Sequence, residues 1–283
     1  MQKEIIIRNP EHFDEILKVI REGGAENLHV LADFDRTLTT AFVDGKSVPS
    51  LISVLRDGNY LTPDYTENAH ALFDKYHAIE IDPTVPFAEK WKAMDEWWRM
   101  HAKLLIESGL NKSDLEKVVS SGKVRLREEF SEFADVLNAH NVPLVIMSAS
   151  GLGVDGVSLY LEHAGKLTDN VHIISNVYEW DSAGRATALR EPIIHSLNKY
   201  ETAIRDYPAF DAIKNRKNVI LLGDSPSDIG MVQGFDYHNL LSISFFNETT
   251  DKNLKLNEDT FDVVLTGDTS MAYVNKILRE VLV

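Results

Sequence analysis

The stretch LHVLADFDRTLTT, residues 28–40, joins an apolar run to two carboxylates. Asp33 and Asp35 stand two residues apart, directly after the apolar residues. Taken alone, an Asp-x-Asp pair is common, and most copies are solvated loop acids or helix caps. The place of this pair at the end of an apolar, strand-like run favours a role in chemistry.

Two further apolar runs also end in polar side chains. Ser148 ends the run 143–148, and Asp224 and Ser225 end the run 218–225, with Asp228 close behind. Ser148 alone is typical of a helix cap, and the acids near 224 could form no more than a capped turn.

The three polar endings are more informative together than singly. Ligands of open α/β sheets bind beyond the carboxyl ends of the strands, so we expect all three endings to meet at one rim. Carboxylates that face one another repel unless a cation neutralises them. An all-oxygen set favours Mg²⁺, held by one or two carboxylates, water and a substrate phosphate.

The elements that must hold these side chains follow from the apolar pattern. Strands and helices alternate from residue 126 onward, which predicts an α/β fold with a doubly wound, mostly parallel sheet. The expected strands are 28–33, 143–148, 171–175, 218–225, 240–246 and 262–266. The expected helices outside the block described next are 10–22, 127–140, 154–164 and 270–281.

A helical block interrupts the alternation after the first strand. Between residues 87 and 105, apolar side chains recur at helical spacing. We therefore expect a core formed by residues 1–41 and 126–283, with an inserted helical cap at 42–125.

Composition narrows the class of protein. The chain has 283 residues, a formal net charge of −15 and no cysteine. Its acidity argues against a nucleic-acid polymer as partner but leaves room for a small phosphorylated ligand. No run approaches the roughly 20 apolar residues of a membrane span, and the start does not read as a signal peptide. We expect a cytoplasmic protein without a membrane partner; its oligomeric state stays open, a monomer included.

Four motifs in order resemble those of the haloacid dehalogenase superfamily: DFDRT (33–37), Ser148, Lys199 in HSLNKYE, and GDSPSD (223–228). The segments YHAIEIDPTVPFAEKWKAMDEWW (76–98) and MSASGLG (147–153) further resemble the cytosolic pyrimidine 5′-nucleotidases, the type III family. The resemblance runs from about residue 28 to the end of the chain. It implies Mg²⁺-dependent removal of phosphate from nucleoside 5′-monophosphates, chiefly CMP and UMP, with 7-methyl-GMP favoured by some members.

The resemblance also implies a role for each motif residue. Asp33 would be the nucleophile and form an aspartyl-phosphate, while Asp35 would be the general acid and base. Mg²⁺ would be held by Asp33, the backbone carbonyl of Asp35 and Asp224. Lys199 would pair with Asp33 and the phosphate. The other implied contacts are phosphate binding by Ser148 and the amide of Ala149, and an outer role for Asp228 and Ser225.

The cap carries the expected base-binding residues. The family pattern places a base- or sugar-binding glutamate at Glu80. His101 stands where the family commonly has serine, so it is expected in the substrate site unless it packs within a helix. Stacking on a base is an alternative to core packing for the tryptophans Trp91, Trp97 and Trp98. No role is assigned to Arg36.

Three alternatives stay open beside the nucleotidase. One is a phosphatase of a sugar phosphate or another small phosphomonoester. A second is phosphotransfer, in which a nucleoside accepts the phosphoryl group in place of water. The third is a binding protein on an inactive scaffold, which the intact set of motif residues disfavours.

Overall fold

A central sheet of seven strands organises the described part of the chain, in the order β1-β11-β10-β9-β2-β5-β6. The structure, a computed structural model, describes residues 4–82, 84–199, 209–233, 236–247 and 253–282. The strands are β1 (Ile5–Ile7), β2 (Leu28–Ala32), β5 (Leu144–Met147), β6 (Val171–Ile174), β9 (Asn218–Gly223), β10 (Asn239–Phe246) and β11 (Val263–Thr266). All neighbours are parallel except β1, which pairs antiparallel with β11 at one edge. The predicted mostly parallel α/β sheet is confirmed.

The middle of the sheet is buried on both faces. Every residue of β2 and β9 is buried, which explains why these strands read as continuous apolar runs instead of alternating ones. Val30 faces one hydrophobic cluster and its neighbour Leu31 faces the other. The chain moves from β2 to β5 on one side and returns to β9 on the other, so β2 lies where the strand order reverses.

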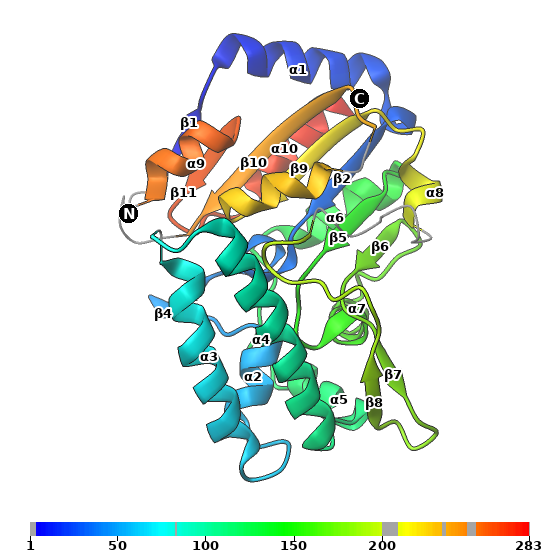
Figure 1. Cartoon of the computed structure of the whole chain (residues 1–283). Helices are drawn as coiled ribbons and strands as arrows, with labels where there is room; N and C mark the ends of the chain where they lie inside the picture. Colours follow the sequence, from blue (N-terminus) through cyan, green and yellow to red (C-terminus); the bar gives the residue numbers. More distant parts are fainter. Residues whose placement is uncertain (1–3, 83, 200–208, 234–235, 248–252, 283) are drawn as a thin grey trace.

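Helices cover both faces of this sheet (Figure 1). One face carries α1 (Pro10–Gly23), α6 (Phe130–Ala139), α7 (Gly153–His163) and α10 (Ala272–Val281). The other carries α8 (Ala209–Ile213), a 3-10 helix (Pro226–Val232) and α9 (Leu254–Thr260). Helix α1 begins as expected, with the Asn9 side chain accepting a hydrogen bond from the amide of His12.

The block between β2 and β5 is largely helical. It contains β3 (Phe42–Val43), β4 (Lys46–Ser47), α2 (Leu51–Asp57), α3 (Tyr65–Ile81), α4 (Phe87–Glu107) and α5 (Lys112–Ser120). The long helices α3 and α4 lie side by side, at the opposite end of the molecule from α1 (Figure 1). We keep the division at residues 42–125 as a proposal and refer to this block as the cap.

A hairpin that the sequence patterns did not indicate lies beside the cap. Its strands are β7 (Tyr178–Trp180) and β8 (Ala186–Leu189), and β8 contacts α4. A bridge between Asn111 and Arg185 joins it to the start of α5. Within the part of the chain that the structure describes, no helix is both long and apolar enough to span a membrane.

Candidate active site

The turn after β2, residues 33–39, carries the first pair of carboxylates, and we call it the catalytic turn. It closes with a hydrogen bond from the Thr39 amide to the Phe34 carbonyl. Its interior is not regular helix, because Asp35 has ψ 126° and Arg36 has φ 63°. The left-handed conformation of Arg36 is uncommon for a residue with a Cβ.

Asp33 lies in a buried cluster of charges. Lys199 Nζ donates to Asp33 Oδ1 at 2.5 Å and to Asp228 Oδ1 at 2.9 Å. Thr37 Oγ1 donates to the other oxygen of Asp33 at 3.2 Å. The side chains of Asp33, Lys199 and Asp228 are 7%, 9% and 2% exposed, so this cation holds its carboxylates with little solvent screening.

The GDSPSD segment folds as a capped turn that fixes Asp228. The amides of Asp224 and Ser225 donate to Asp228 Oδ2, at 3.1 and 3.0 Å, and the Ser225 side chain caps the short helix in return. A Cβ on Gly223 would lie 2.6 Å from the Cβ of Asp228, so the close approach of this turn to β9 needs glycine.

Asp33, Asp224 and Asp228 together form a group that could hold a metal ion. One oxygen of each lies within 4.8 Å of the others. An all-carboxylate set fits a hard cation such as Mg²⁺. Both oxygens of Asp228 accept hydrogen bonds, and the amides of Asp224 and Ser225 are among the donors, so this carboxylate also orders the turn that carries Asp224.

Burial and mutual repulsion shape the ionisation of the cluster. Burial raises the pKa of Asp33 to about 6, against the opposing effect of Lys199. Burial and then the charge of Asp33 raise the pKa of Asp35 to about 7. Burial, Asp228 and Asp33 hold the pKa of Asp224 well above its usual range. Although burial opposes its charge, the carboxylates of Asp228 and Asp33 raise the pKa of Lys199.

Asp35 differs from Asp33 in its contacts. Its Oδ1 is buried and accepts no hydrogen bond from any residue that the structure describes. A buried acceptor without a partner is costly, and such groups gather at sites that bind or react. This oxygen is therefore available to a ligand.

Ser148 and Ala149 follow β5, the strand beside β2. Ser148 is 1% exposed, and its Oγ accepts from the amide of Ser150 at 3.1 Å. The Ala149 carbonyl accepts from Trp98 Nε1 at 3.0 Å, so helix α4 of the cap is tied to this loop. The strand register places the endings of β2, β5 and β9 at one edge of the sheet, as expected.

Glu80 also joins the cap to the core. Its Oε1 accepts from Ser196 Oγ at 2.6 Å, three residues before Lys199. Its Oε2 lies 3.1 Å from Nδ1 of His77. The structure thus places Glu80 beside the loop that carries Lys199.

His101 is placed inside the cap. Its Nε2 lies 3.1 Å from the hydroxyl of Tyr65, and the two rings stack at 6.2 Å. Burial lowers the pKa of His101 to about 4, so the ring is neutral at pH 7. These contacts agree with helix packing rather than with a substrate contact.

The tryptophans of α4 fall into two groups. Trp97 stacks on Tyr76 within the cap. Trp91 and Trp98 lie against His195 of the core, with ring centroids 5.2 and 6.2 Å away. Trp91 and Trp98 are therefore the two that line the junction of cap and core.

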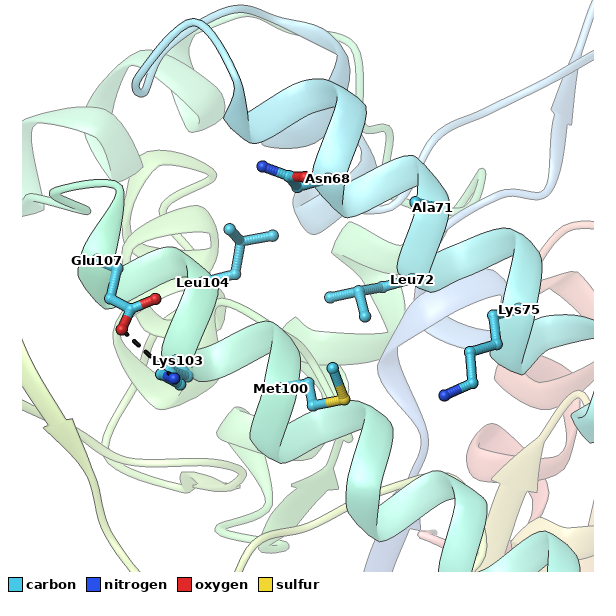
Figure 2. Close-up of a pocket in the computed structure, with 8 residues that line it drawn as sticks. All are labelled: Asn68, Ala71, Leu72, Lys75, Met100, Lys103, Leu104 and Glu107. Atoms are coloured by element: carbon cyan, nitrogen blue, oxygen red, sulfur yellow. Dashed lines mark ion pairs between the residues drawn. The ribbon is translucent and has the colours of Figure 1, made fainter.

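A hollow of about 460 Å³ lies elsewhere, on the outside of the cap between α3 and α4 (Figure 2). Leu72, Met100 and Leu104 line it, with the Lys103–Glu107 ion pair at its edge. It contains none of the residues predicted from the motifs.

Two contributors to the site were not found from the sequence. Arg127 binds carbonyl groups of the catalytic turn, and Asp268 pairs with Arg127 at 3.0 Å. Both are far from Asp33 in the chain, and neither lies in a recognisable motif. The apolar strand 262–266 just before Asp268 was the one local signal, because polar residues after such strands tend to face the site.

Comparisons with known proteins agree with this geometry. The family model described as pyrimidine 5′-nucleotidase (UMPH-1) matches residues 36–282, starting just after Asp33 and Asp35. A 7-methylguanosine phosphate-specific 5′-nucleotidase from Gallus gallus is 32% identical over 284 residues, covering 100% of this chain and 98% of the relative. A putative cytosolic 5′-nucleotidase 3 from Caenorhabditis elegans is 30% identical, covering 98% and 75%.

Solved structures give the same result. Cytosolic 5′-nucleotidase IIIB bound to cytidine superposes with a TM-score of 0.88 at 29% identity, covering 99% of this chain and 94% of that one. A substrate-bound phosphoserine phosphatase, at 16% identity and a TM-score of 0.53, covers 89% of this chain and 97% of its own and shares the fold alone. The chain therefore belongs to the pyrimidine 5′-nucleotidase family and is a hydrolase that acts on phosphate monoesters.

Proposed function

We propose that the protein is a divalent-metal-dependent 5′-nucleotidase that works through an aspartyl-phosphate on Asp33. The observation that carries this proposal is the pairing of two unlike carboxylates. Asp33 is buried and held by Lys199 and Thr37, while the adjacent Asp35 has a buried oxygen that no described residue satisfies. We assign the first as the nucleophile and the second as the group that exchanges a proton, first with the leaving oxygen and then with water.

In the first step, a carboxylate oxygen of Asp33 forms a bond to phosphorus as the bond from phosphorus to the nucleoside O5′ breaks. Asp35 gives its proton to that departing oxygen. In the second step, water attacks the phosphorus of the aspartyl-phosphate and gives a proton to Asp35. Phosphate leaves, and Asp33 is restored as a carboxylate.

The neighbouring side chains hold the charge of the phosphoryl group. Lys199 Nζ lies 2.5 Å from Asp33 Oδ1 and would contact a phosphate bound to that carboxylate. Ser148 and the amide of Ala149, at the end of the next strand, would hold phosphate oxygens. These donors stabilise charge that spreads over the phosphoryl oxygens during transfer.

A divalent ion such as Mg²⁺ would be held by Asp33, Asp224 and the backbone carbonyl of Asp35. Bound there, it supplies positive charge that lets an anionic nucleophile approach an anionic phosphate. The group formed by Asp33, Asp224 and Asp228 supports this assignment.

The base is expected to meet Glu80. An ionised glutamate only accepts hydrogen bonds, so it favours a base with N–H donors on its exposed edge. The cytosine amino group offers this, and so do the N1–H and amino groups of 7-methylguanine. We retain pyrimidine nucleotides as the proposed substrates. 7-Methyl-GMP is the competing substrate, because several relatives are named as 7-methylguanosine phosphate-specific 5′-nucleotidases.

Partners and location follow the sequence expectations. A small nucleotide is the proposed partner, with no nucleic-acid polymer and no membrane, and the proposed location is the cytoplasm. The oligomeric state stays open.

The deciding experiment measures phosphate release from CMP, UMP, 7-methyl-GMP, AMP and a sugar phosphate, with Mg²⁺ and with chelator. We expect release from a nucleotide that needs the metal and is lost in Asp33→Asn. Turnover of the sugar phosphate alone would refute the nucleotidase assignment. Adding free nucleoside and looking for new nucleotide tests phosphotransfer by the same intermediate.

A further inference from the structure

Arg127 is a buried arginine at the point where the chain returns from the cap. Its side chain is 1% exposed. Its amide donates to the Leu38 carbonyl at 2.8 Å, and Leu126 bridges Thr39. The return segment is therefore paired directly with the end of the catalytic turn.

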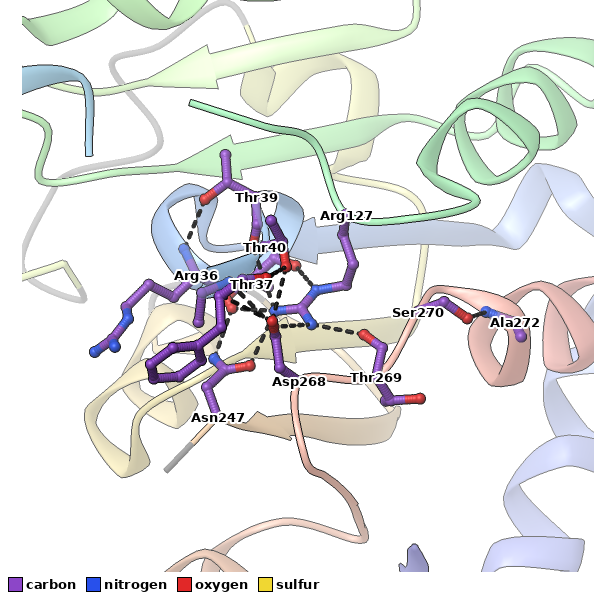
Figure 3. Close-up of polar contacts among 12 residues, drawn as sticks. Arg36, Thr37, Thr39, Thr40, Arg127, Asn247, Asp268, Thr269, Ser270 and Ala272 are labelled. Carbon is purple, nitrogen blue, oxygen red and sulfur yellow. Dashed lines mark hydrogen bonds and ion pairs between the residues drawn. The ribbon is translucent and has the colours of Figure 1, made fainter. Parts of the chain in front are cut away.

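The guanidinium of Arg127 satisfies the carbonyl groups of that turn. Nε donates to Thr37 O at 2.7 Å, and Nη2 donates to Thr39 O at 3.3 Å and also to Arg36 O (Figure 3). These carbonyls belong to a turn with irregular dihedral angles, so no helical ladder holds them together. One planar group with five N–H donors can bind all three carbonyls and its side-chain partners as well, whereas a lysine has only three N–H donors at a single atom.

Asp268 and Asn247 hold Arg127 in turn. Asp268 Oδ1 accepts from Arg127 Nη1 at 3.0 Å, and Asn247 Oδ1 accepts from Nη2 at 3.2 Å. The Asn247 side chain also donates to Arg36 O at 2.8 Å (Figure 3). The carbonyl of Arg36, the residue with positive φ, is thus bonded from two sides.

Asp268 also fixes the segment that leaves the core for the cap. Its carboxylate accepts from the amides of Ala41 and Phe42, at 3.0 and 2.8 Å, and from the Thr40 hydroxyl at 2.8 Å. One ion pair, Arg127–Asp268, therefore holds both points at which the chain passes between core and cap.

We propose that Arg127, locked by Asp268 and Asn247, is a positioning residue for the reaction: it holds the turn that presents Asp35 and Thr37 beside Asp33. This inference rests on the proposed function, because it concerns the delivery of the nucleophile and the proton donor. Arg127 acts through the backbone of the turn and touches no reacting atom.

The test compares Arg127→Lys, Arg127→Met and Asp268→Asn with wild type, on p-nitrophenyl phosphate, CMP and 7-methyl-GMP with Mg²⁺. We expect kcat to fall about 100-fold or more with KM little changed, since a small misplacement of reacting groups has this effect. The lysine variant should not restore turnover, because it keeps the positive charge but loses the planar set of N–H donors. Should Arg127→Met not fold, Asp268→Asn carries the same test with a side chain of the same shape.

Arg216→Met is the matched control. Arg216 also holds backbone carbonyls, those of Ala25 and Leu28 at 2.6 and 2.8 Å, but at the opposite end of β2. We expect it to lower stability while leaving the kcat of the folded enzyme near wild type. Equal loss of kcat in Arg216→Met and the Arg127 variants, or unchanged kcat in the latter, would overturn the inference.

Hydrogen exchange supplies a readout that does not need activity. Amides 36–41 should lose protection in the Arg127 variants and keep it in Arg216→Met. If wild type releases no phosphate, the proposed function fails. The exchange result still tests whether Arg127 holds the catalytic turn. Unchanged protection of amides 36–41 in Arg127→Met would refute the positioning role.

Discussion

Asp33 and Asp35 share a turn but not an environment. Lys199 and Thr37 hold both oxygens of Asp33, whereas Asp35 Oδ1 is buried without a described partner. The residue types and their order were predictable from the motifs. The difference in their contacts was not, because it depends on residues that are distant in the chain.

Replacing Asp35 by asparagine should separate proton transfer from nucleophilic attack. We expect kcat on a nucleotide to fall by about 10²–10⁴, because general acid–base catalysis contributes that much. The loss should be smaller on p-nitrophenyl phosphate, whose leaving oxygen needs no proton. Steady-state kinetics on both substrates measures the difference, and Asp44→Asn, in an exposed loop, is the control. Equal losses on both substrates would contradict the acid role.

Replacing Asp224 by asparagine should reveal the cation site without any substrate. Asp33, Asp224 and Asp228 repel one another when no ion is bound, so the variant should melt higher than metal-free wild type. Mg²⁺ should raise the Tm of wild type, because a ligand that binds only the folded state stabilises it, and should raise that of the variant much less. Calorimetry with chelator and with Mg²⁺ measures both. An equal Mg²⁺ response in the two proteins would place the metal elsewhere.

At the scale of elements, the sheet was predictable and the junctions were not. Buried parallel strands such as β2 and β9 are continuous apolar runs, which a single sequence reveals. The hairpin of β7 and β8 is short, and its place against α4 is set by tertiary contacts. Arg127 and its partner Asp268 are 141 residues apart in the chain. Local sequence patterns do not predict a contact at that separation.

The bond from Trp98 to the Ala149 carbonyl joins helix α4 to the loop of the proposed phosphate site. Trp98→Phe removes this donor but keeps most of the packing. One hydrogen bond contributes about 1 kcal/mol, so we expect kcat/KM of Trp98→Phe to fall several-fold. Trp97→Phe is the control on the same helix, because Trp97 stacks on Tyr76 within the cap. Kinetic constants equal in the two variants would show that this bond does not couple cap and loop.

At the scale of the whole molecule, buried neutral histidines link stability to pH. Burial lowers the pKa of His29, His101 and His195, each to about 4. His29 belongs to the central strand β2, His101 lies within the cap, and His195 lies at the junction of cap and core. Acid should therefore weaken all three regions together.

His101 gives the clearest test, because it lies away from the carboxylate cluster, packed on Tyr65 and facing the charge of Arg56. Its pKa is lower in the folded than in the unfolded state, so its contribution to stability is complete above pH 6.5 and is lost as the pH falls toward 4.

Between pH 7 and 5 this loss amounts to about 2 kcal/mol. His101→Gln keeps a group that can bond to Tyr65 but cannot take up a proton. Between pH 7 and 5, its free energy of unfolding should therefore fall by about 2 kcal/mol less than that of wild type. Urea unfolding followed by tryptophan fluorescence at pH 7, 6 and 5 measures this, with the exposed His12→Gln as control. Parallel pH dependences of wild type and His101→Gln would show that the pKa of His101 is the same in the folded and the unfolded protein. Such a result would reopen the question of whether its ring faces the substrate.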